Sequence, residues 1–282
     1  MKEIILEVNN LSKKFENQDR NILENVSFKI NSGDFVSILG ASGSGKSTLL
    51  TICGGMDIPS KGEIIFNGVD ITKLKEKDLA VLRRTKIGFV FQFFNLAPYL
   101  NAEENIVLPM ILDAKSSKGY NNDLEYLLDY LKLQDLRKKM PSQLSGGEQQ
   151  RIAIARGLIY KPKIIYLDEP TGNLDSKIAK EIMELLVRIN IEFGTTIMQV
   201  THSEYNASYG NKIIRINDGK IIEEVVIRNI ESEPIIVNEN NVNSENILMD
   251  IENQIVDNKP DENQMVDNNP NENQNSEVEE DK

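Results

Sequence analysis

One short stretch, GASGSGKS at residues 40–47, limits the fold of this chain more than any other feature. It matches the pattern G-x-x-x-x-G-K-[ST], a loop whose backbone N–H groups are free to surround phosphate groups. The apolar run Phe35–Leu39 just before it is typical of a buried parallel strand, and the residues after it are typical of a helix. A loop of this kind between a strand and a helix predicts an α/β fold.

Each residue type in this loop has a separate task toward bound phosphates. We predict that Lys46 reaches the β- and γ-phosphates, that Ser47 places its hydroxyl on Mg²⁺, and that Thr48 reaches the α-phosphate. An ordinary glycine-rich turn is the weaker alternative, because every defined position of the pattern is matched between a strand and a helix. The predicted phosphate-binding residues are Gly40, Ala41, Ser42, Gly43, Ser44, Gly45, Lys46, Ser47 and Thr48.

Two carboxylates follow a second apolar run, Lys163–Leu167, which we expect to be a strand. Asp168 lies at the carboxyl end of this strand, where a carboxylate can bind Mg²⁺ beside a phosphate loop. Glu169 comes next and is the candidate general base that polarises the attacking water. An apolar run followed by an aspartate is common, so this assignment depends on the phosphate loop.

Three further residues have both a functional and an ordinary interpretation. Gln92 is a candidate for contact with Mg²⁺ and the attacking water, although an isolated glutamine is usually a surface residue. His202, the only histidine, follows the strand-like run Thr196–Val200 at a sheet edge where ligands of α/β proteins gather. Phe15 is a candidate for stacking on a nucleobase, but core packing is the default for phenylalanine. Cys53 is the only cysteine, so an intrachain disulfide is excluded.

A second anion site is predicted about a hundred residues after the first, in the sequence LSGGEQQRIAIAR at 144–156. Ser145, Gly146 and Gly147 precede a run of helical periodicity, and small residues at the start of a helix leave N–H groups free at its positive end. One chain therefore carries two candidate phosphate sites.

Regular patterns divide the first 228 residues into three parts. The first is rich in predicted strands, at Ile4–Val8, Val26–Ile30, Phe35–Leu39 and Glu63–Phe66. A helical insertion is predicted at about 93–160, and Asn101 is the expected cap of one of its helices. The α/β pattern then resumes, with strands at Lys163–Leu167 and Thr196–Val200, a helix at 177–193, and a hairpin across Asp218-Gly219.

Residues 229–282 differ from the rest in composition. The net charge of the chain is −12, and residues 231–282 contain 15 acidic residues and only 2 lysines, so the remainder is nearly neutral. The segments ENQIVDNKPD and ENQMVDNNPN form a ten-residue repeat without aromatic residues. Such a segment buries too little apolar surface to fold alone, so we predict a disordered tail. A basic nucleic-acid-binding face is not indicated in either part.

The chain from about residue 3 to 228 resembles an ABC-type ATPase, the nucleotide-binding subunit of ATP-driven transporters. Six motifs carry the resemblance: GASGSGKST, Gln92, LSGGEQQ, IIYLDE, GNLD ending at Asp175, and His202. Two positions depart from the pattern, because Glu148 stands where many members have glutamine and Phe15 stands where a tyrosine is usual. The region IGFVFQFFNLAPYLNAEENIVLPM is similar to the macrolide-export, lipoprotein-release and bacitracin-export group.

The resemblance implies a P-loop NTPase core with a mixed sheet, an N-terminal antiparallel β part and an inserted helical subdomain. It implies ATP and Mg²⁺ as cofactors, Asp168, Ser47 and Gln92 as metal contacts, and Glu169, His202 and Gln92 as catalytic residues. Two subunits are expected to face each other head to tail, so that Ser145, Gly146, Gly147 and Asp175 of one complete the site of the other.

The expected function is to power a separate membrane permease with an extracytoplasmic domain, from the cytoplasmic face of the membrane. The expected cargo of such an exporter is a peptide antibiotic, a lipoprotein or another hydrophobic compound. A regulatory ATPase that signals through a membrane partner without transport is the alternative. Soluble members that act on ribosomes or DNA usually have two cassettes or a long coiled coil, and this chain has room for neither.

Overall fold

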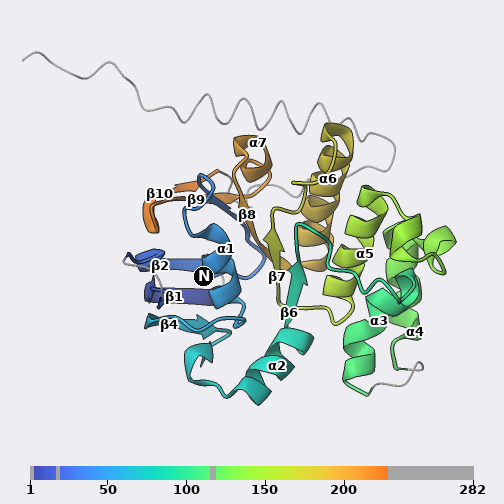
Figure 1. Cartoon of the computed structure of the whole chain (residues 1–282), viewed down its shortest axis with the longest axis horizontal. Coiled ribbons are helices and arrows are strands. Elements are labelled where there is room, and N and C mark those ends of the chain that lie inside the picture. Colours follow the sequence, from blue (N-terminus) through green and yellow to red (C-terminus); the bar gives the residue numbers. More distant parts are fainter. Residues whose placement is uncertain (1–2, 17–19, 115–118, 228–282) are drawn as a thin grey trace, which may run out of the picture. The chain divides into compact units, whose positions relative to one another are not determined.

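The computed structural model describes residues 3–16, 20–114 and 119–227. Contacts divide the chain into residues 1–236 and 237–282, and every described residue lies in the first unit. The predicted disordered tail at 229–282 lies outside the described residues. The described residues form the α/β fold that the sequence predicts, with two sheets and flanking helices (Figure 1).

The larger sheet has six strands in the order β10-β9-β3-β8-β7-β6. Its strands are β3 (Phe35–Leu39), β6 (Ile87–Val90), β7 (Ile164–Asp168), β8 (Thr196–Thr201), β9 (Lys212–Asn217) and β10 (Lys220–Val226). All neighbours pair in parallel except β10, which forms the predicted hairpin with β9. Because strands buried on both faces are apolar along their length, the short runs at β3 and β7 identify the centre of this sheet.

The smaller sheet is antiparallel, in the order β2-β1-β4-β5. It consists of β1 (Ile4–Lys13), β2 (Leu23–Asn31), β4 (Lys61–Phe66) and β5 (Val69–Asp70). Each predicted strand is present but longer than predicted, since its ladder also includes exposed polar residues such as Asn10, Glu24 and Lys61. This is the antiparallel β part that the resemblance implies.

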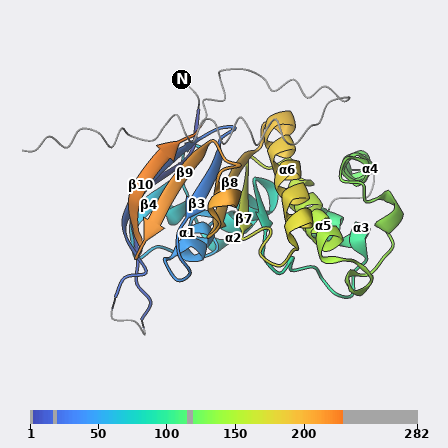
Figure 2. The ribbon, with the colours of Figure 1, turned by 90° about the horizontal axis from the view of Figure 1, so that it is seen from above.

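Helices cover both faces of the larger sheet (Figure 2). On β7, Ile164 and Tyr166 pack with the core around α1 (Lys46–Cys53). Ile165 and Leu167 pack with the core on the other face, around α5 (Gly146–Leu158) and α6 (Ser176–Phe193). The alternation follows from the two-residue period of a strand. The helix α6 (Ser176–Phe193) agrees with the predicted helix, whereas α2 (Glu76–Thr85) was not predicted.

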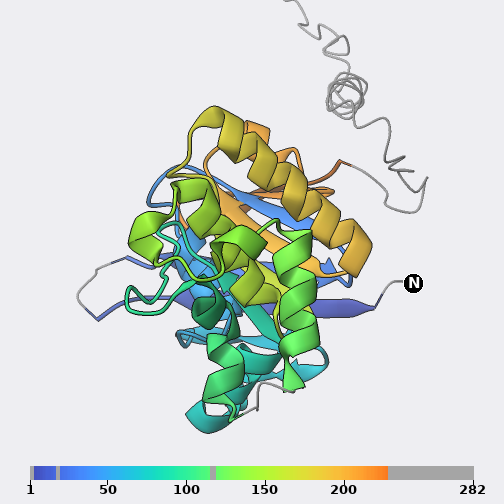
Figure 3. The same cartoon turned by 90° about the vertical axis from the view of Figure 1, so that its right-hand side faces the viewer.

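The predicted helical region contains α3 (Ala102–Leu112), α4 (Asn121–Tyr130) and α5 (Gly146–Leu158), which pack on one another (Figure 3). Asn101 caps α3 as expected, since its side chain accepts from the Glu104 N–H and the Glu104 carboxylate accepts from the Asn101 N–H. Residues 93–101 contain no helix. The short helix α7 (Glu204–Ala207) follows β8.

Candidate functional site

The predicted phosphate loop joins β3 to α1 and is shaped by glycines. Gly45 precedes the first turn of α1 with φ 95°, a left-handed conformation that favours glycine. A Cβ at Gly45 would lie 2.7 Å from the Ile22 carbonyl oxygen, so a side chain does not fit there. Gly40 is equally restricted by the Ile216 carbonyl. The loop is therefore a backbone cradle that only small residues can form.

Lys46 lies inside this cradle. Its ammonium donates hydrogen bonds to the carbonyl oxygens of Gly40 (2.9 Å) and Ala41 (2.8 Å). Burial lowers the pKa of Lys46, and the nearby carboxylates of Glu169 and Asp168 oppose this shift. The Ser44 hydroxyl, buried in the same loop, has no hydrogen-bond partner among the described residues. A buried hydroxyl without a hydrogen-bond partner indicates that a bound ligand supplies one.

Asp168 lies beside the loop, as predicted. Its Oδ1 accepts a hydrogen bond of 2.9 Å from the Ser47 hydroxyl. Burial raises the pKa of Asp168 and Glu169 adds to the rise, whereas the Ser47 hydrogen bond and the Lys46 charge oppose it. Two oxygen donors that meet in this way fit a hard cation such as Mg²⁺.

Glu169 turns the chain sharply where β7 ends. Its φ of 46° is in the left-handed region, which costs a residue with a side chain about 1–3 kcal/mol and is typical of functional sites. The turn brings the carboxylate to His202, whose Nδ1 lies 2.9 Å from Glu169 Oε1. The structure thus pairs two residues that the sequence proposed separately. The carboxylate is 15% exposed and the imidazole 67% exposed, so the pair is open to water on the histidine side.

Gln92 lies two residues beyond the end of β6. Its side-chain amide packs against Gly172, where a Cβ would lie 2.9 Å from Gln92 Nε2. The Gln92 carbonyl also accepts a hydrogen bond from Asn173. Gln92 is therefore held by the segment that follows Glu169.

The second predicted phosphate site begins α5. Ser145 caps the helix, and the Glu148 carboxylate accepts hydrogen bonds from both the backbone N–H and the hydroxyl of Ser145. These bonds lower the pKa of Glu148. Gly146 and Gly147 lie so close to Leu174 and Ile178 that added side chains would crowd them.

Asp175 starts the neighbouring helix, since its carboxylate accepts from the Ile178 N–H at the first turn of α6. The Asp175 segment and the start of α5 therefore lie side by side. The hydrogen bonds that the structure gives Ser145 stay within α5 and do not reach the phosphate loop of the same chain.

Phe15 is 40% exposed, and the Lys13 ammonium lies 4.9 Å from its ring centroid. An exposed ring suits stacking better than the core position that is the default for phenylalanine. Cys53 is fully buried, its carbonyl accepts from the Tyr166 hydroxyl, and burial raises the pKa of its thiol.

The four phenylalanines in and after β6 differ in exposure. Phe89 and Phe91 stack on each other and are half-buried, Phe93 is 73% exposed, and Phe94 packs against the core beside α5. Both Phe94 and Asn95 have left-handed backbone conformations, and the half-buried guanidinium of Arg156 donates to both carbonyls. Burial lowers the pKa of Arg156. The sequence analysis did not identify Arg156. Its position among apolar residues of a helix could have indicated that it has a structural partner.

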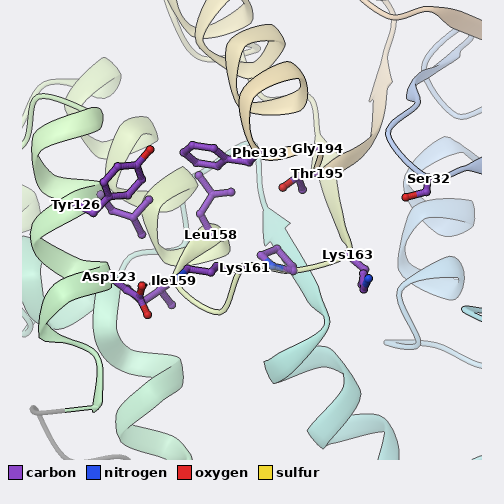
Figure 4. Close-up of a pocket in the computed structure, with 12 residues that line it drawn as sticks. Ser32, Asp123, Tyr126, Leu158, Ile159, Lys161, Lys163, Phe193, Gly194 and Thr195 are labelled. Carbon is purple, nitrogen blue, oxygen red and sulfur yellow. Dashed lines mark ion pairs between the residues drawn. The ribbon is translucent and has the colours of Figure 1, made fainter. Parts of the chain in front are cut away.

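A separate cavity of about 420 Å³ lies between α4 and the carboxyl ends of α5 and α6 (Figure 4). Tyr126 and Phe193 line it, together with an ion pair of 2.7 Å between Asp123 and Lys161. None of the predicted site residues lines this cavity.

Comparison with known proteins gives three kinds of match. The family model described as ABC transporter matches residues 23–172. The chain is 44% identical over 221 residues to the lipoprotein-releasing system ATP-binding protein LolD of Aquifex aeolicus, covering 78% of this chain and 97% of the relative. It is 42% identical over 233 residues to the macrolide export ATP-binding/permease protein MacB of Bdellovibrio bacteriovorus, covering 82% of this chain but only 35% of that protein.

Solved structures agree with these matches. A dimeric structure of a post-hydrolysis state of the ATP-binding cassette MJ0796 of Methanocaldococcus jannaschii, bound to ADP and Pi, has a TM-score of 0.73 at 41% identity. The similarity covers 79% of this chain and 99% of that structure. A Clostridium perfringens cbiO1 structure has a TM-score of 0.72 at 30% identity, with 79% and 88% coverage. Among the described residues, no helix is long and apolar enough to cross a membrane.

Proposed function

The chain belongs to the ABC transporter family as an ATP-binding, ATP-hydrolysing subunit, and from this premise we propose that it powers a separate membrane permease. The proposed cargo is a peptide antibiotic, a lipoprotein or another hydrophobic compound that is exported or extracted. Names of relatives support this cargo class, since one is a lipoprotein-releasing system protein and another a macrolide exporter.

The observation that carries the enzymatic proposal is the meeting of two residue pairs beside the phosphate loop. Ser47 and Asp168 are joined by a 2.9 Å hydrogen bond, and Glu169 and His202 lie 2.9 Å apart. Because Asp168 and Glu169 are adjacent, oxygen donors suited to a metal lie beside a candidate base. ATP hydrolysis needs this combination of a phosphate cradle, a metal site and a base.

Each residue has a proposed task. Lys46 exchanges its bonds with the loop carbonyls for bonds to phosphate oxygens, while the loop N–H groups bind the remaining oxygens. Ser47 and Asp168 would hold Mg²⁺, which neutralises charge that develops on the phosphates. Glu169 accepts a proton from the attacking water, and His202 holds the Glu169 carboxylate in place and contacts the phosphate end. The left-handed turn at Glu169 places the carboxylate beyond the end of β7.

We further propose that two copies of the chain form each complete site. Ser145 and the N–H groups of Gly146 and Gly147 form an anion site at the start of α5, and Ser145 makes no hydrogen bond to the phosphate loop of its own chain. A partner subunit in head-to-tail orientation would use that site for its γ-phosphate. The dimeric cassette structures of MJ0796 support this arrangement.

The proposed location is the cytoplasmic surface of the membrane, where the chain is held by its permease. Phe93 and Tyr99 are 73% and 90% exposed on the loop after β6, and exposed aromatic residues on one loop suit a protein partner. One relative, named as an ATP-binding/permease protein, supports the same kind of partner. An extracytoplasmic domain on that permease is part of the proposal.

Replacing Glu169 with glutamine tests the proposed reaction. The amide keeps the shape but removes the proton acceptor, so ATP turnover should fall by about 10²–10⁴-fold while ATP binding is retained. The variant should accumulate as an ATP-bound dimer in size-exclusion chromatography. Glu184→Gln on α6 is the matched control and should hydrolyse ATP at the wild-type rate. Wild-type turnover in Glu169→Gln would remove Glu169 from the proposed role.

A further inference from the structure

A polar amide lies in the middle of the larger sheet. Gln199, in β8, is fully buried, and its Nε2 donates hydrogen bonds of 2.8 Å to the Ser37 hydroxyl and to the Asn206 carbonyl. Buried amides are unfavourable unless they are hydrogen-bonded. Here the hydrogen bonds fix the end of α7 onto the sheet, since Ser37 in turn donates to the Ala207 carbonyl.

Asn206 extends this network to the catalytic side. Its Nδ2 donates a hydrogen bond of 2.8 Å to Oγ1 of Thr171, which is buried. Thr171 lies two residues after Glu169, and Asn206 lies four residues after His202. The loop after β7 and the segment after β8, which includes α7, are thus joined twice. One connection is the Asn206–Thr171 bond and the other is the Glu169–His202 contact of 2.9 Å.

The two connections differ in exposure. The His202 side chain is 67% exposed, so its contact with Glu169 competes with water. The Asn206–Thr171 bond is anchored on a buried threonine and on the amide of Gln199. A hydrogen bond with one buried partner is less open to replacement by water than a contact made by a side chain that is 67% exposed. We therefore expect the Asn206–Thr171 bond to set the separation of the two segments, and the Glu169–His202 contact to depend on it.

We propose that Asn206 is a positioning residue for ATP hydrolysis: it fixes the loop of His202 to the loop of Glu169 through Thr171. The inference rests on the proposed roles of Glu169 and His202. Pre-organised side chains raise the rate because the reacting groups need no rearrangement in the transition state. The bond does not touch the phosphate loop, so it should affect turnover and leave ATP binding unchanged.

Two variants that remove the bond without changing the size of the side chain test the proposal. Asn206→Leu removes the donor and Thr171→Val removes the acceptor hydroxyl. Each should lower kcat of the full-length protein by about 3- to 10-fold, as expected for one lost hydrogen bond, with KM for ATP unchanged. The double variant should be no slower than the slower single variant, and Thr171→Ser, which keeps the hydroxyl, should restore most of the rate.

Asn211→Leu is the matched control, because Asn211 binds Asp34 and the Phe35 N–H at the opposite end of β3. It should lower the melting temperature without changing kcat. If kcat stays at the wild-type value in Asn206→Leu or Thr171→Val, or if the two effects multiply in the double variant, the proposal is wrong. Either result would leave the proposed reaction itself untouched, because the Glu169→Gln variant tests the role of Glu169 separately.

Discussion

The Ser47 hydroxyl donates a 2.9 Å hydrogen bond to Asp168 Oδ1, joining residues 121 positions apart in the sequence. Ser47 is in the first turn of α1, and Asp168 is the last residue of β7. The contact joins the carboxyl end of β7 to α1, the helix that follows the parallel strand β3. Both oxygens are thereby placed at the same point beside Lys46, where a metal and its phosphates are expected.

The first prediction concerns this pair. Replacing Asp168 with asparagine keeps an oxygen for the Ser47 hydrogen bond but removes the negative charge that favours a divalent cation. We expect the Mg²⁺ concentration needed for half-maximal ATPase activity to rise about 10- to 100-fold, the range seen when groups supporting a metal site are changed. A magnesium titration of ATP hydrolysis measures this. An unchanged requirement would place the metal elsewhere.

The second prediction concerns pH and the cap of α5. The hydrogen bonds from Ser145 lower the pKa of Glu148 below its unfolded value of 4.5. The carboxylate therefore stabilises the folded state above about pH 4.5, and this stabilisation is lost as the pH falls through the lowered pKa. Glu148→Gln keeps the capping box without titrating.

Comparison of the unfolding free energies of wild type and Glu148→Gln between pH 3 and pH 7 tests this statement. Wild type should be more stable by about 0.3–1 kcal/mol at pH 7, because a negative charge at a helix N-terminus is favourable. The difference should shrink as the pH falls below about 4.5. A difference that is constant over the whole range would mean that Glu148 is not titrating within the cap.

The third prediction tests the shared site. A Lys46→Ala subunit and a Ser145→Arg subunit should each be inactive alone. Mixed together, they form heterodimers in which both lesions fall on one site, so about a quarter of wild-type turnover should return if pairing is random. ATPase assays over a range of mixing ratios measure the recovery. Since Ser145 also caps α5, the melting temperature of Ser145→Arg must show that this subunit is folded.

If no mixing ratio restores turnover, either the two sites are obligatorily coupled or the head-to-tail dimer is wrong. A cysteine at Ser145 and another at Ser42 of the second chain separate these cases. An ATP-dependent cross-link without recovered activity would indicate coupled sites. Absence of both cross-link and activity would contradict the dimer.

The fourth prediction concerns the partner surface. Phe93 is 73% exposed, so Phe93→Asp should leave the stability and ATPase rate of the isolated subunit unchanged but abolish stimulation by the permease. Phe94→Asp is the contrasting variant, because Phe94 packs against the core and its carbonyl binds Arg156. It should lower the melting temperature by several degrees, as expected for a charge placed in a core. Loss of nucleotide binding in Phe93→Asp would mean that this residue is structural.

The sequence alone predicts those parts of the candidate site that depend on local backbone chemistry. A glycine-rich loop between a strand and a helix can bind phosphate through its own N–H groups, so residues 40–48 are predicted without the fold. Asp168 and Glu169 are predicted because they follow an apolar, strand-like run. Ser145 is predicted because a helix start exposes free N–H groups wherever it lies.

Only the tertiary structure decided which side chains meet across the sheet. The bonds from Asn206 to Thr171, from Gln199 to Ser37 and from Arg156 to Phe94 join residues 35, 162 and 62 positions apart. No periodicity or motif encodes such pairs, because they depend on strand order and on how the helices and loops pack around the sheet. The exposure of Phe15 and Phe93 is decided in the same way. A single sequence states which residues can bind phosphate, whereas packing of distant strands determines which groups hold them in position.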